Sequence, residues 1–206
     1  MLSGFLGSGK TTLLKRIAEN DAGHKIAVIV NDVAALNIDA SFVRRSGRKK
    51  AFDEASVIEM QNGCICCTLR TDLVKAIAEL ATGPVQYDAI VVEASGVSEP
   101  AQIGEMFQTE FMNAAEDGES LRSARDKNAM AQVLNAMKGA SSLEEIVRLD
   151  TCITVVDCSA FNGDITTPED LRSRFDVREE SGERSVATLL AEQIEFADLI
   201  VLNKCD

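Results

Sequence analysis

The chain has 206 residues, 46% of them hydrophobic and 26% charged, which is the composition of an ordinary globular domain with a sizeable core. Its formal net charge of −12 at pH 7 argues against a nucleic-acid partner, because such partners need clustered Lys and Arg, and the lack of an apolar run of ~20 residues argues against a membrane span. The six cysteines, three of them crowded into CICC, do not resemble the framework of a secreted disulfide-rich protein, so we expect a reducing compartment, the cytoplasm.

Apolar stretches alternate with helical patterns along the chain. Five stretches are predicted as buried strands: KIAVIV at 25–30, ASVIEM at 55–60, DAIVVE at 88–93, TCITVV at 151–156 and ADLIVL at 197–202. Apolar residues at 13–18 and at 69–80 have the spacing of one helix face. Strands that alternate with helices in this way predict an α/β fold with a mostly parallel sheet flanked by helices.

Some parts of the chain carry no chemical motif. The polar segment 107–149 is predicted to be an inserted helical or surface segment, and 162–184 a charged surface loop, so we expect both to be solvated surface. Cys152 and Cys158 are an even number of residues apart, so in a continuous strand their side chains would point to the same face. Both are predicted as small core residues. His24 is the single histidine and is predicted to lie at the surface.

The stretch LSGFLGSGKTTLL at residues 2–14 contains the pattern GxxxxGK[ST]. In this pattern the glycines let backbone N–H groups close around phosphate oxygens, the lysine reaches the terminal phosphates, and the hydroxyl of the last residue binds Mg²⁺. The alternative is a glycine-rich turn, but TTLLKRIA supplies a helix whose N-terminus favours an anion. We therefore predict a nucleotide phosphate site that consists of Gly4, Gly7, Ser8, Gly9, Lys10, Thr11 and Thr12.

The position of this loop in the chain is unusual. Such a loop normally follows a central strand, and only Met1, Leu2 and Ser3 precede it, fewer than the roughly 5 to 6 residues of an average strand. The chain also stops on the last residue of NKCD at 203–206. We expect one P-loop domain over 1–206, truncated at both ends, whose sheet has a weakened centre.

The NKCD sequence directly follows a predicted strand and contains Asn203, Lys204 and Asp206. A carboxylate in this position can accept hydrogen bonds from both the ring N–H and the exocyclic amine of guanine, which adenine cannot supply. A site with such paired groups discriminates strongly, because the wrong base leaves a buried charge unpaired. Alone, NKCD would be an ordinary solvated turn, but after a P-loop it predicts guanine binding.

The stretch VVEASGVSEP places an acid at the end of a predicted strand. Glu93 followed by Gly96 has the form of a carboxylate that holds Mg²⁺ and a glycine that senses the γ-phosphate. The alternative is a strand-end acid that faces solvent. Asn31, Asp32 and Asp39 follow another strand, where a nucleotide-responsive loop is expected, and Asp32 is a further candidate for metal binding.

The stretch QNGCICCTLRTDL places three thiols, Cys64, Cys66 and Cys67, within four residues before a predicted helix, whose N-terminus would favour thiolates. Thiolates suit Zn²⁺ or Cu(I), and three protein ligands leave one coordination position open, which suits metal transfer. One alternative to a metal site is that two of the thiols form a redox pair. Another is that two of the thiols are buried and the third is exposed.

Together, SGFLGSGKTTLL, NGCICC, EASGVSEP, QIEFAD and NKCD resemble the CobW-type metallochaperone GTPases, and in particular their zinc-related branch. The resemblance covers nearly all of the chain, and GCxCC between a P-loop and ExxG is the specific mark of that family. Many members read NEFGE in the switch region, whereas this chain has Asp32 at the first acid and Ala35 at the second.

The resemblance implies a P-loop NTPase fold and GTP hydrolysis coupled to delivery of a transition metal, zinc, cobalt or another, to a client protein. It places Lys10, Thr11, Glu93 and Gly96 at the phosphates and Mg²⁺, the NKCD residues at guanine, and the three cysteines at the transition metal. GTP, Mg²⁺ and Zn²⁺ are the expected cofactors, and a nucleotide-dependent homodimer is left open. The alternatives are a nucleotide-dependent metal sensor or regulatory module with incidental hydrolysis, and an inactive fragment.

Overall fold

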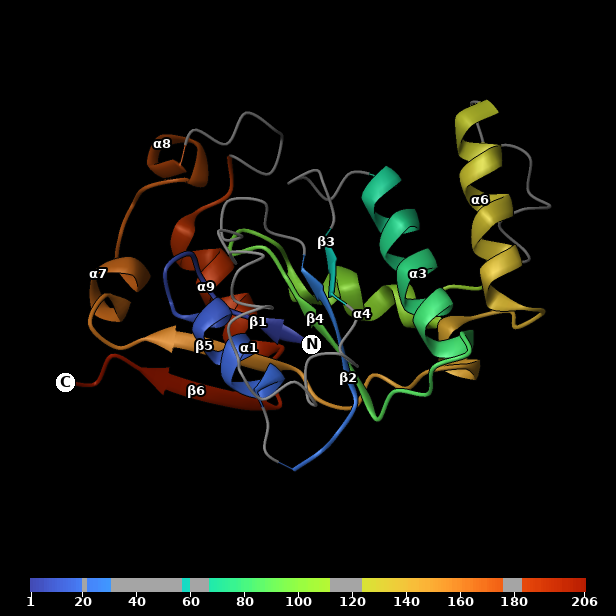
Figure 1. The fold of residues 1–206 in the computed structure, drawn as a ribbon. Coiled ribbons are helices and arrows are strands. Elements are labelled where there is room, and N and C mark those ends of the chain that lie inside the picture. The colour runs from blue at the N-terminus through green and yellow to red at the C-terminus, as the bar shows by residue number, and fades with distance from the viewer. Residues whose placement is uncertain (20–21, 31–56, 60–66, 112–123, 176–182) are drawn as a thin grey trace.

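The computed structural model of the chain describes residues 1–19, 22–30, 57–59, 67–111, 124–175 and 183–206 (Figure 1). The strands in these ranges are β1 (Leu2–Ser3), β2 (Ile26–Val30), β3 (Val57–Glu59), β4 (Ala89–Glu93), β5 (Ile153–Asp157) and β6 (Leu199–Asn203). The helices are α1 (Lys10–Ala18), α3 (Cys67–Thr82), α4 (Pro100–Gln108), α6 (Ala124–Met137), the 3₁₀ turn η1 (Leu143–Glu145), α7 (Phe161–Ile165), α8 (Leu171–Phe175) and α9 (Val186–Glu195).

The described strands form one parallel sheet in the order β3-β2-β4-β1-β5-β6, which confirms the predicted α/β fold. Strand β1 lies between β4 and β5, because Leu2 pairs with Glu93 on one side and with Ile153 on the other. It has 2 residues, whereas β4 and β5 have 5 each. The central strand that leads into the P-loop is therefore short, as the sequence predicts.

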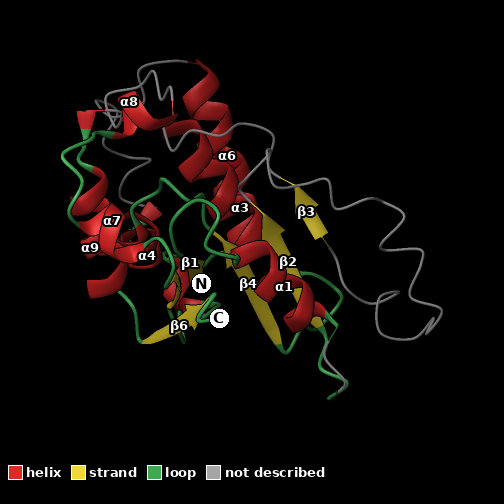
Figure 2. Cartoon of the chain, turned by 90° about the vertical axis from the view of Figure 1, so that its left-hand side faces the viewer, coloured by secondary structure: helices red, strands yellow, loops and turns green. Residues whose placement is uncertain are grey.

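Helices cover both faces of the sheet (Figure 2). Alternate residues of β2 point to opposite faces: Val28 packs in a cluster with Leu14 of α1, and Ile29 packs in a cluster with Ile77 of α3 and Ile103 of α4. On the α4 side, the Thr154 hydroxyl of β5 donates to the carbonyl of Gln193 in α9, at 2.7 Å. Strand β2 is consequently buried on both sides, which explains its continuously apolar sequence. The prediction of a buried strand at 197–202 is wrong about burial, because Leu199, Ile200 and Leu202 of β6 are exposed.

The two segments predicted as solvated surface contribute to the core instead, so that prediction is wrong in part. In the described part of 107–149, Val133 and Met137 of α6 are buried against α3, and Leu143 is also buried. In 162–184, Leu171 of α8 is buried in a cluster with Leu189 of α9. A few apolar residues at helical spacing are enough to pack these segments against the core. Whether 107–149 is an insertion stays a prediction.

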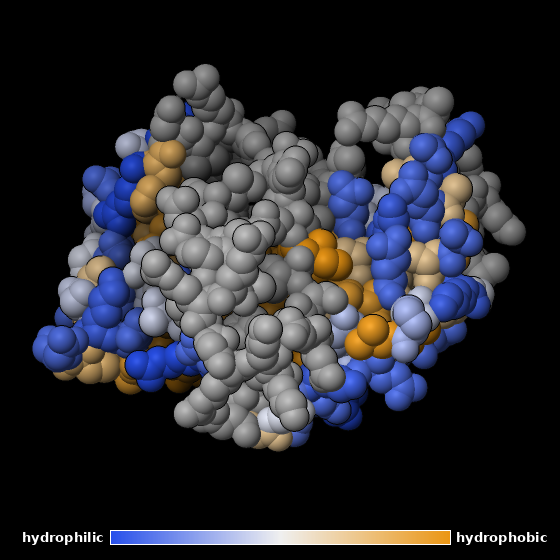
Figure 3. Space-filling model, viewed as in Figure 1, coloured by the Kyte–Doolittle hydropathy of each residue, from blue (hydrophilic) through white to orange (hydrophobic). Residues whose placement is uncertain are grey.

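The outer surface of α6 is polar. Figure 3 shows hydrophilic residues gathered over this helix, on the right of the view, consistent with the exposed Asn128 and Gln132. No helix in the described ranges combines the length and the apolar character that a membrane crossing requires.

Candidate functional site

The P-loop connects β1 to α1 through a backbone that only glycine accommodates at two points. Gly4 has φ +132°, and a Cβ there would lie 2.3 Å from the carbonyl oxygen of Val155 in β5. Gly9 has φ +105°, and a Cβ there would lie 2.3 Å from Nδ2 of Asn203. Gly7 also has a positive φ, +74°, but open space beside it. The loop therefore packs directly against β5 and the start of NKCD, and the first and last glycines are required for that contact.

Hydrogen bonds close the loop on itself. The carbonyl of Phe5 accepts from the backbone N–H of Ser8 at 3.2 Å and from Nζ of Lys10 at 3.0 Å. Lys10 is buried, and the Ser8 hydroxyl is buried with no hydrogen-bond partner within the described residues. Thr12 is exposed on the first turn of α1. A glycine-rich loop that ends on a helix N-terminus is a site for an anion, because backbone N–H groups and the helix dipole face the same point.

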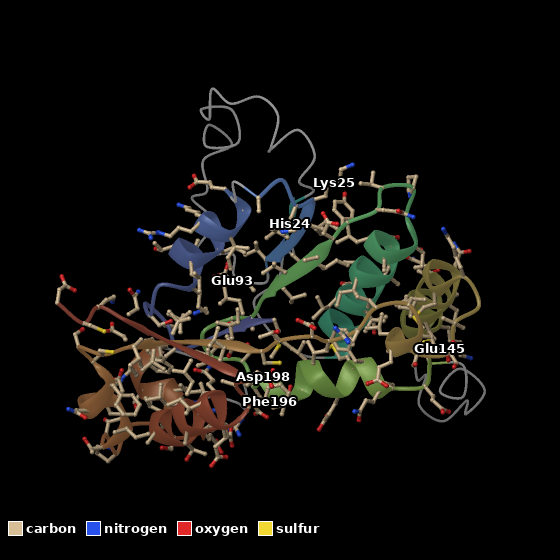
Figure 4. All side chains as sticks on the ribbon, turned by 90° about the horizontal axis from the view of Figure 1, so that it is seen from below. His24, Lys25, Glu93, Glu145, Phe196 and Asp198 are labelled. Atoms are coloured by element: carbon tan, nitrogen blue, oxygen red, sulfur yellow. The ribbon has the colours of Figure 1, made fainter. Side chains whose placement is uncertain are left out.

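Glu93 ends β4 beside α1, inside the molecule rather than at its surface (Figure 4). It is 0% exposed, so the alternative of a solvent-facing acid is wrong. Its Oε1 accepts a hydrogen bond from the Thr11 hydroxyl at 2.9 Å. Two oxygens at this separation fit adjacent ligands of Mg²⁺, since octahedral coordination at about 2.1 Å places neighbouring oxygens roughly 3 Å apart. Thr11 and Glu93 therefore fit a magnesium site.

The loop after β4 lies against the P-loop. A Cβ at Gly96 would lie 2.7 Å from the backbone nitrogen and from two side-chain carbons of Leu6, so only glycine fits this contact. Gln193 of α9 is 0% exposed, and its Nε2 donates to the carbonyls of Gly96 and Ser98, each at 3.2 Å. The ExxG loop is thus held between the P-loop and α9.

The NKCD sequence reaches the P-loop through its first residue. Nδ2 of Asn203 donates to the carbonyl of Ser8 at 2.8 Å. Nζ of Lys204 donates to Oδ2 of Asp157 at 2.6 Å, and this hydrogen bond, with a smaller contribution from Ser159, lowers the pKa of Asp157 to about 2. Asp206 is exposed at the same end of the sheet. Asn203 therefore joins the candidate guanine motif to the candidate phosphate site.

The predicted transition-metal residues fall largely outside the described ranges. Asp32, Cys64 and Cys66 lie outside them, and Cys67 is the first residue of α3. In the part of the chain that is described, no group of three His, Cys, Asp or Glu side chains is placed to hold a metal ion. The thiol cluster and the Asp32 site therefore stay predictions.

Two of the three predictions for the remaining residues are confirmed. Cys152 is buried, and burial raises the pKa of its thiol. His24 is exposed. The prediction that Cys158 is a core residue is wrong, because β5 ends at Asp157 and Cys158 is half-exposed in the turn beyond it. Side chains alternate between the two faces of a sheet only within a strand, so the alternation does not predict the position of Cys158.

Sequence reasoning missed the roles of Gln193 and Asp157. Gln193 belongs to QIEFAD, which contributed to the resemblance without suggesting any contact. A glutamine at an otherwise apolar helix position was the available signal, because such a side chain must find hydrogen-bond partners when buried. Asp157, the residue after the apolar run of β5, carried a similar signal, since strand-end acids of parallel sheets gather at one edge.

A cavity of about 740 Å³ lies elsewhere, lined among others by Met1, Asp88, Arg148 and Thr151. None of the predicted site residues that the structure describes lines it. The candidate phosphate, magnesium and guanine residues that the structure describes gather at the P-loop instead, so size alone does not identify the candidate site.

Comparisons with known proteins agree with this arrangement. The zinc-regulated GTPase metalloprotein activator 1 of Dictyostelium discoideum is 39% identical over 212 residues, which cover 100% of this chain and 39% of that protein. The zinc chaperone CobW of Sinorhizobium sp is 30% identical, and the one of Pseudomonas aeruginosa 31%; each alignment covers 100% of this chain and respectively 50% and 48% of the relative. The chain thus spans half or less of the length of these relatives. No solved structure matches it significantly.

The family model for the nucleotide-binding domain of CobW/HypB/UreG matches residues 1–133 and 127–206, which together cover the whole chain. With the P-loop, Glu93 and NKCD gathered at one end of a parallel sheet, sequence and structure lead to the same assignment. The chain belongs to the CobW/HypB/UreG family.

Proposed function

We propose that the protein binds GTP with Mg²⁺, hydrolyses it, and uses the nucleotide state to control the binding and delivery of a transition metal, zinc, to a client protein in the cytoplasm. The observation that carries the proposal is the joining of three motifs by two hydrogen bonds. Thr11 donates to Glu93, 82 residues away, and Asn203 donates to Ser8, 195 residues away. A P-loop, a buried strand-end acid and an NKxD motif in contact form the parts of a GTP site.

The phosphates of GTP would lie against the P-loop. Backbone N–H groups at the start of α1 would donate to phosphate oxygens, and Lys10 would pair with their charge. Thr11 and Glu93 would hold Mg²⁺, which when bound neutralises negative charge on the phosphates. Gly96, which touches the P-loop at Leu6, brings a second backbone segment to the place where a γ-phosphate would be sensed. The same end of the sheet therefore holds both the binding and the sensing elements.

Guanine recognition rests on NKCD. The Asp206 carboxylate would accept two hydrogen bonds from guanine, and Asn203 would keep this motif next to the P-loop through its bond to Ser8. The ion pair between Lys204 and Asp157 restrains the turn that carries Asp206. A base that cannot donate both bonds leaves the carboxylate without partners, so ATP should bind poorly.

Metal handling would reside in the cysteines. Cys64, Cys66 and Cys67 are the proposed zinc ligands, and support comes from their spacing and from relatives whose names describe zinc chaperones and a zinc-regulated GTPase. Zinc is cargo in this proposal, and its release follows when GTP is hydrolysed and the loop contacts at Gly96 change. The client and a nucleotide-dependent homodimer stay predictions.

Nucleotide specificity is the first test. We expect Mg²⁺-dependent hydrolysis of GTP and little hydrolysis of ATP. Asp206→Ala should weaken GTP binding by about tenfold or more through loss of two charge-assisted hydrogen bonds. Glu195→Ala is the matched control, because it removes an exposed acid at the far end of α9. Equal binding of GTP and ATP by the unchanged protein would contradict the proposed guanine site.

Coupling to zinc is the second test. Zinc affinity is measured by competition with a chelating dye in the presence of a non-hydrolysable GTP analogue and of GDP. Cys66→Ser should weaken zinc binding without abolishing GTP binding, whereas Cys152→Ala, which removes a buried core thiol, should leave zinc affinity unchanged. Equal zinc affinities in the two nucleotide states would remove the coupling from the proposal.

A further inference from the structure

Two thiols outside the CICC cluster lie together beside the candidate guanine motif. Cys158 follows β5 and Cys205 follows β6, two parallel strands that end side by side near the C-terminus (Figure 1). The Sγ atoms of Cys205 and Cys158 are 3.4 Å apart and share a hydrogen bond. The chain is brought to this contact by Lys204, which has a left-handed backbone with φ +55°. A residue other than glycine rarely adopts this conformation, so the turn that pairs the thiols is a specific one.

Neighbouring contacts hold the two strand ends together. The backbone N–H of Cys158 donates to the carbonyl of Asn203 at 2.9 Å. The residue before each thiol takes part in an ion pair, since Lys204 is paired with Asp157. The thiols therefore meet within a frame of one backbone hydrogen bond and one ion pair, and little backbone movement is needed to join them.

The surroundings favour a disulfide over a metal centre. Asp157, the adjacent carboxylate, already accepts hydrogen bonds from Lys204 and from the hydroxyl of Ser159. Among the described residues no group of three potential ligands includes these thiols. Two thiolates alone make a poor zinc site, since zinc takes at least three protein ligands. Two adjacent thiols, by contrast, supply both sulfurs of a disulfide, and an oxidant is the one further requirement.

We propose that Cys158 and Cys205 form an oxidation site, in which a peroxide converts the two thiols into a disulfide that weakens guanine nucleotide binding. Cys205 is exposed and reacts first: its sulfur attacks a peroxide oxygen, the S–O bond forms, the O–O bond breaks, and one water leaves. Cys158 then attacks the oxidised sulfur, the S–S bond forms, the S–O bond breaks, and a second water leaves. Two thiols and one hydrogen peroxide thus give one disulfide and two waters.

This order of events agrees with the state of the second thiol. The pKa of Cys158 is raised, first by its hydrogen bond with Cys205 and then by burial. A raised pKa keeps Cys158 protonated and less reactive towards peroxide, so it acts as the resolving thiol.

The effect on the nucleotide rests on the proposed function. Closing the sulfurs from 3.4 Å to the roughly 2 Å of a disulfide moves Cys205, which lies between Lys204 and Asp206. The carboxylate of Asp206 must meet two donors of guanine within a few tenths of an ångström to form good hydrogen bonds. A shift of its immediate neighbour therefore weakens GTP binding, by about tenfold or more if the paired bonds are lost.

The test treats the reduced protein with hydrogen peroxide and follows two readouts. Mass spectrometry of peptides under non-reducing conditions should show Cys158 linked to Cys205, and binding of a fluorescent GTP analogue should fall and recover after dithiothreitol. Cys158→Ser should bind the analogue like the reduced protein and resist the loss on oxidation. Cys152→Ala is the matched control and should respond like the unchanged protein, which separates this pair from the buried Cys152.

Absence of the Cys158–Cys205 peptide after oxidation would overturn the proposal. A loss of binding that persists in Cys158→Ser would also overturn it, because the Cys158–Cys205 disulfide would then not be the cause. A disulfide that forms while affinity stays unchanged would refute its effect on the nucleotide. Failure of the reduced protein to bind the GTP analogue refutes the proposed GTP site instead, and the peptide readout still decides whether the pair is oxidised.

Discussion

Gly96 offers a sharp test of how the ExxG loop meets the P-loop. A Cβ at this position would lie 2.7 Å from Leu6, whereas ordinary van der Waals contacts begin at 3.4 Å. Gly96→Ala must therefore separate the two loops by roughly 0.7 Å. Since a misplacement of about 1 Å in a catalytic site can cost 10²-fold in rate, we expect GTP hydrolysis to fall by about 10- to 100-fold. The added methyl should also lower the free energy of unfolding by about 1–3 kcal/mol.

A second glycine provides the matched control. A Cβ at Gly104 of α4 would also lie 2.7 Å from its neighbour, the ring of Phe196, but at a distance from the P-loop contacts. Gly104→Ala should have a smaller effect on stability, because alanine favours the helix by up to about 1 kcal/mol, and it should leave hydrolysis unchanged. Steady-state phosphate release and urea unfolding measure the two effects. If folded Gly96→Ala hydrolyses GTP at the rate of the unchanged protein, the inference that this contact positions the sensing loop is refuted.

Three further changes test other contacts. Gln193→Leu removes the donor to two buried carbonyls and should lower the free energy of unfolding by roughly 1–3 kcal/mol in urea; an unchanged midpoint would contradict the bridging role. Asp157→Asn should cost about 1 kcal/mol or less near pH 6, because its pair with Lys204 is partly exposed. Since the folded-state pKa of Asp157 is lowered to about 2, this difference is complete above the unfolded value of about 4 and should vanish as pH falls through 2 in pH-dependent unfolding. Met137→Ala should cost about 2–5 kcal/mol, whereas Lys127→Ala on the exposed side of the same helix should cost little; equal effects would place α6 outside the core.

The strands were predictable because of where they lie. Strands buried on both faces read as continuous apolar runs, as β2 does, and β4, β5 and β6 also match a predicted stretch closely, although β6 is largely exposed. The docking of α6 was not predictable in the same way. Val133 and Met137 are few among polar residues, and their burial depends on α3 lying opposite, which is a property of the packed molecule.

The candidate site, too, was predictable in part. The residue types and spacings of GxxxxGK[ST], ExxG and NKxD predict phosphate, metal and base chemistry without coordinates, because each motif is local. The error at Cys158 arose because the prediction assumed that side chains go on alternating between the two faces of the sheet, whereas β5 stops one residue earlier. Local patterns do not record where an element ends when no glycine or proline marks the end.

By itself, the sequence determined the α/β class, the family resemblance and the identity of the chemical groups, since hydrophobic period and short motifs depend on neighbours along the chain. Only the tertiary structure decided which of these groups meet. Glu93 reaches Thr11, Asn203 reaches Ser8, Gln193 reaches Gly96 and Cys205 reaches Cys158. Each contact joins residues that lie far apart in the chain; parallel strand order brings Glu93, Asn203 and the two thiols to one end of the sheet, and Gln193 comes from helix α9. The physical reason is that all strands of a parallel sheet end at the same edge, so side chains beyond those ends converge whatever their separation in sequence.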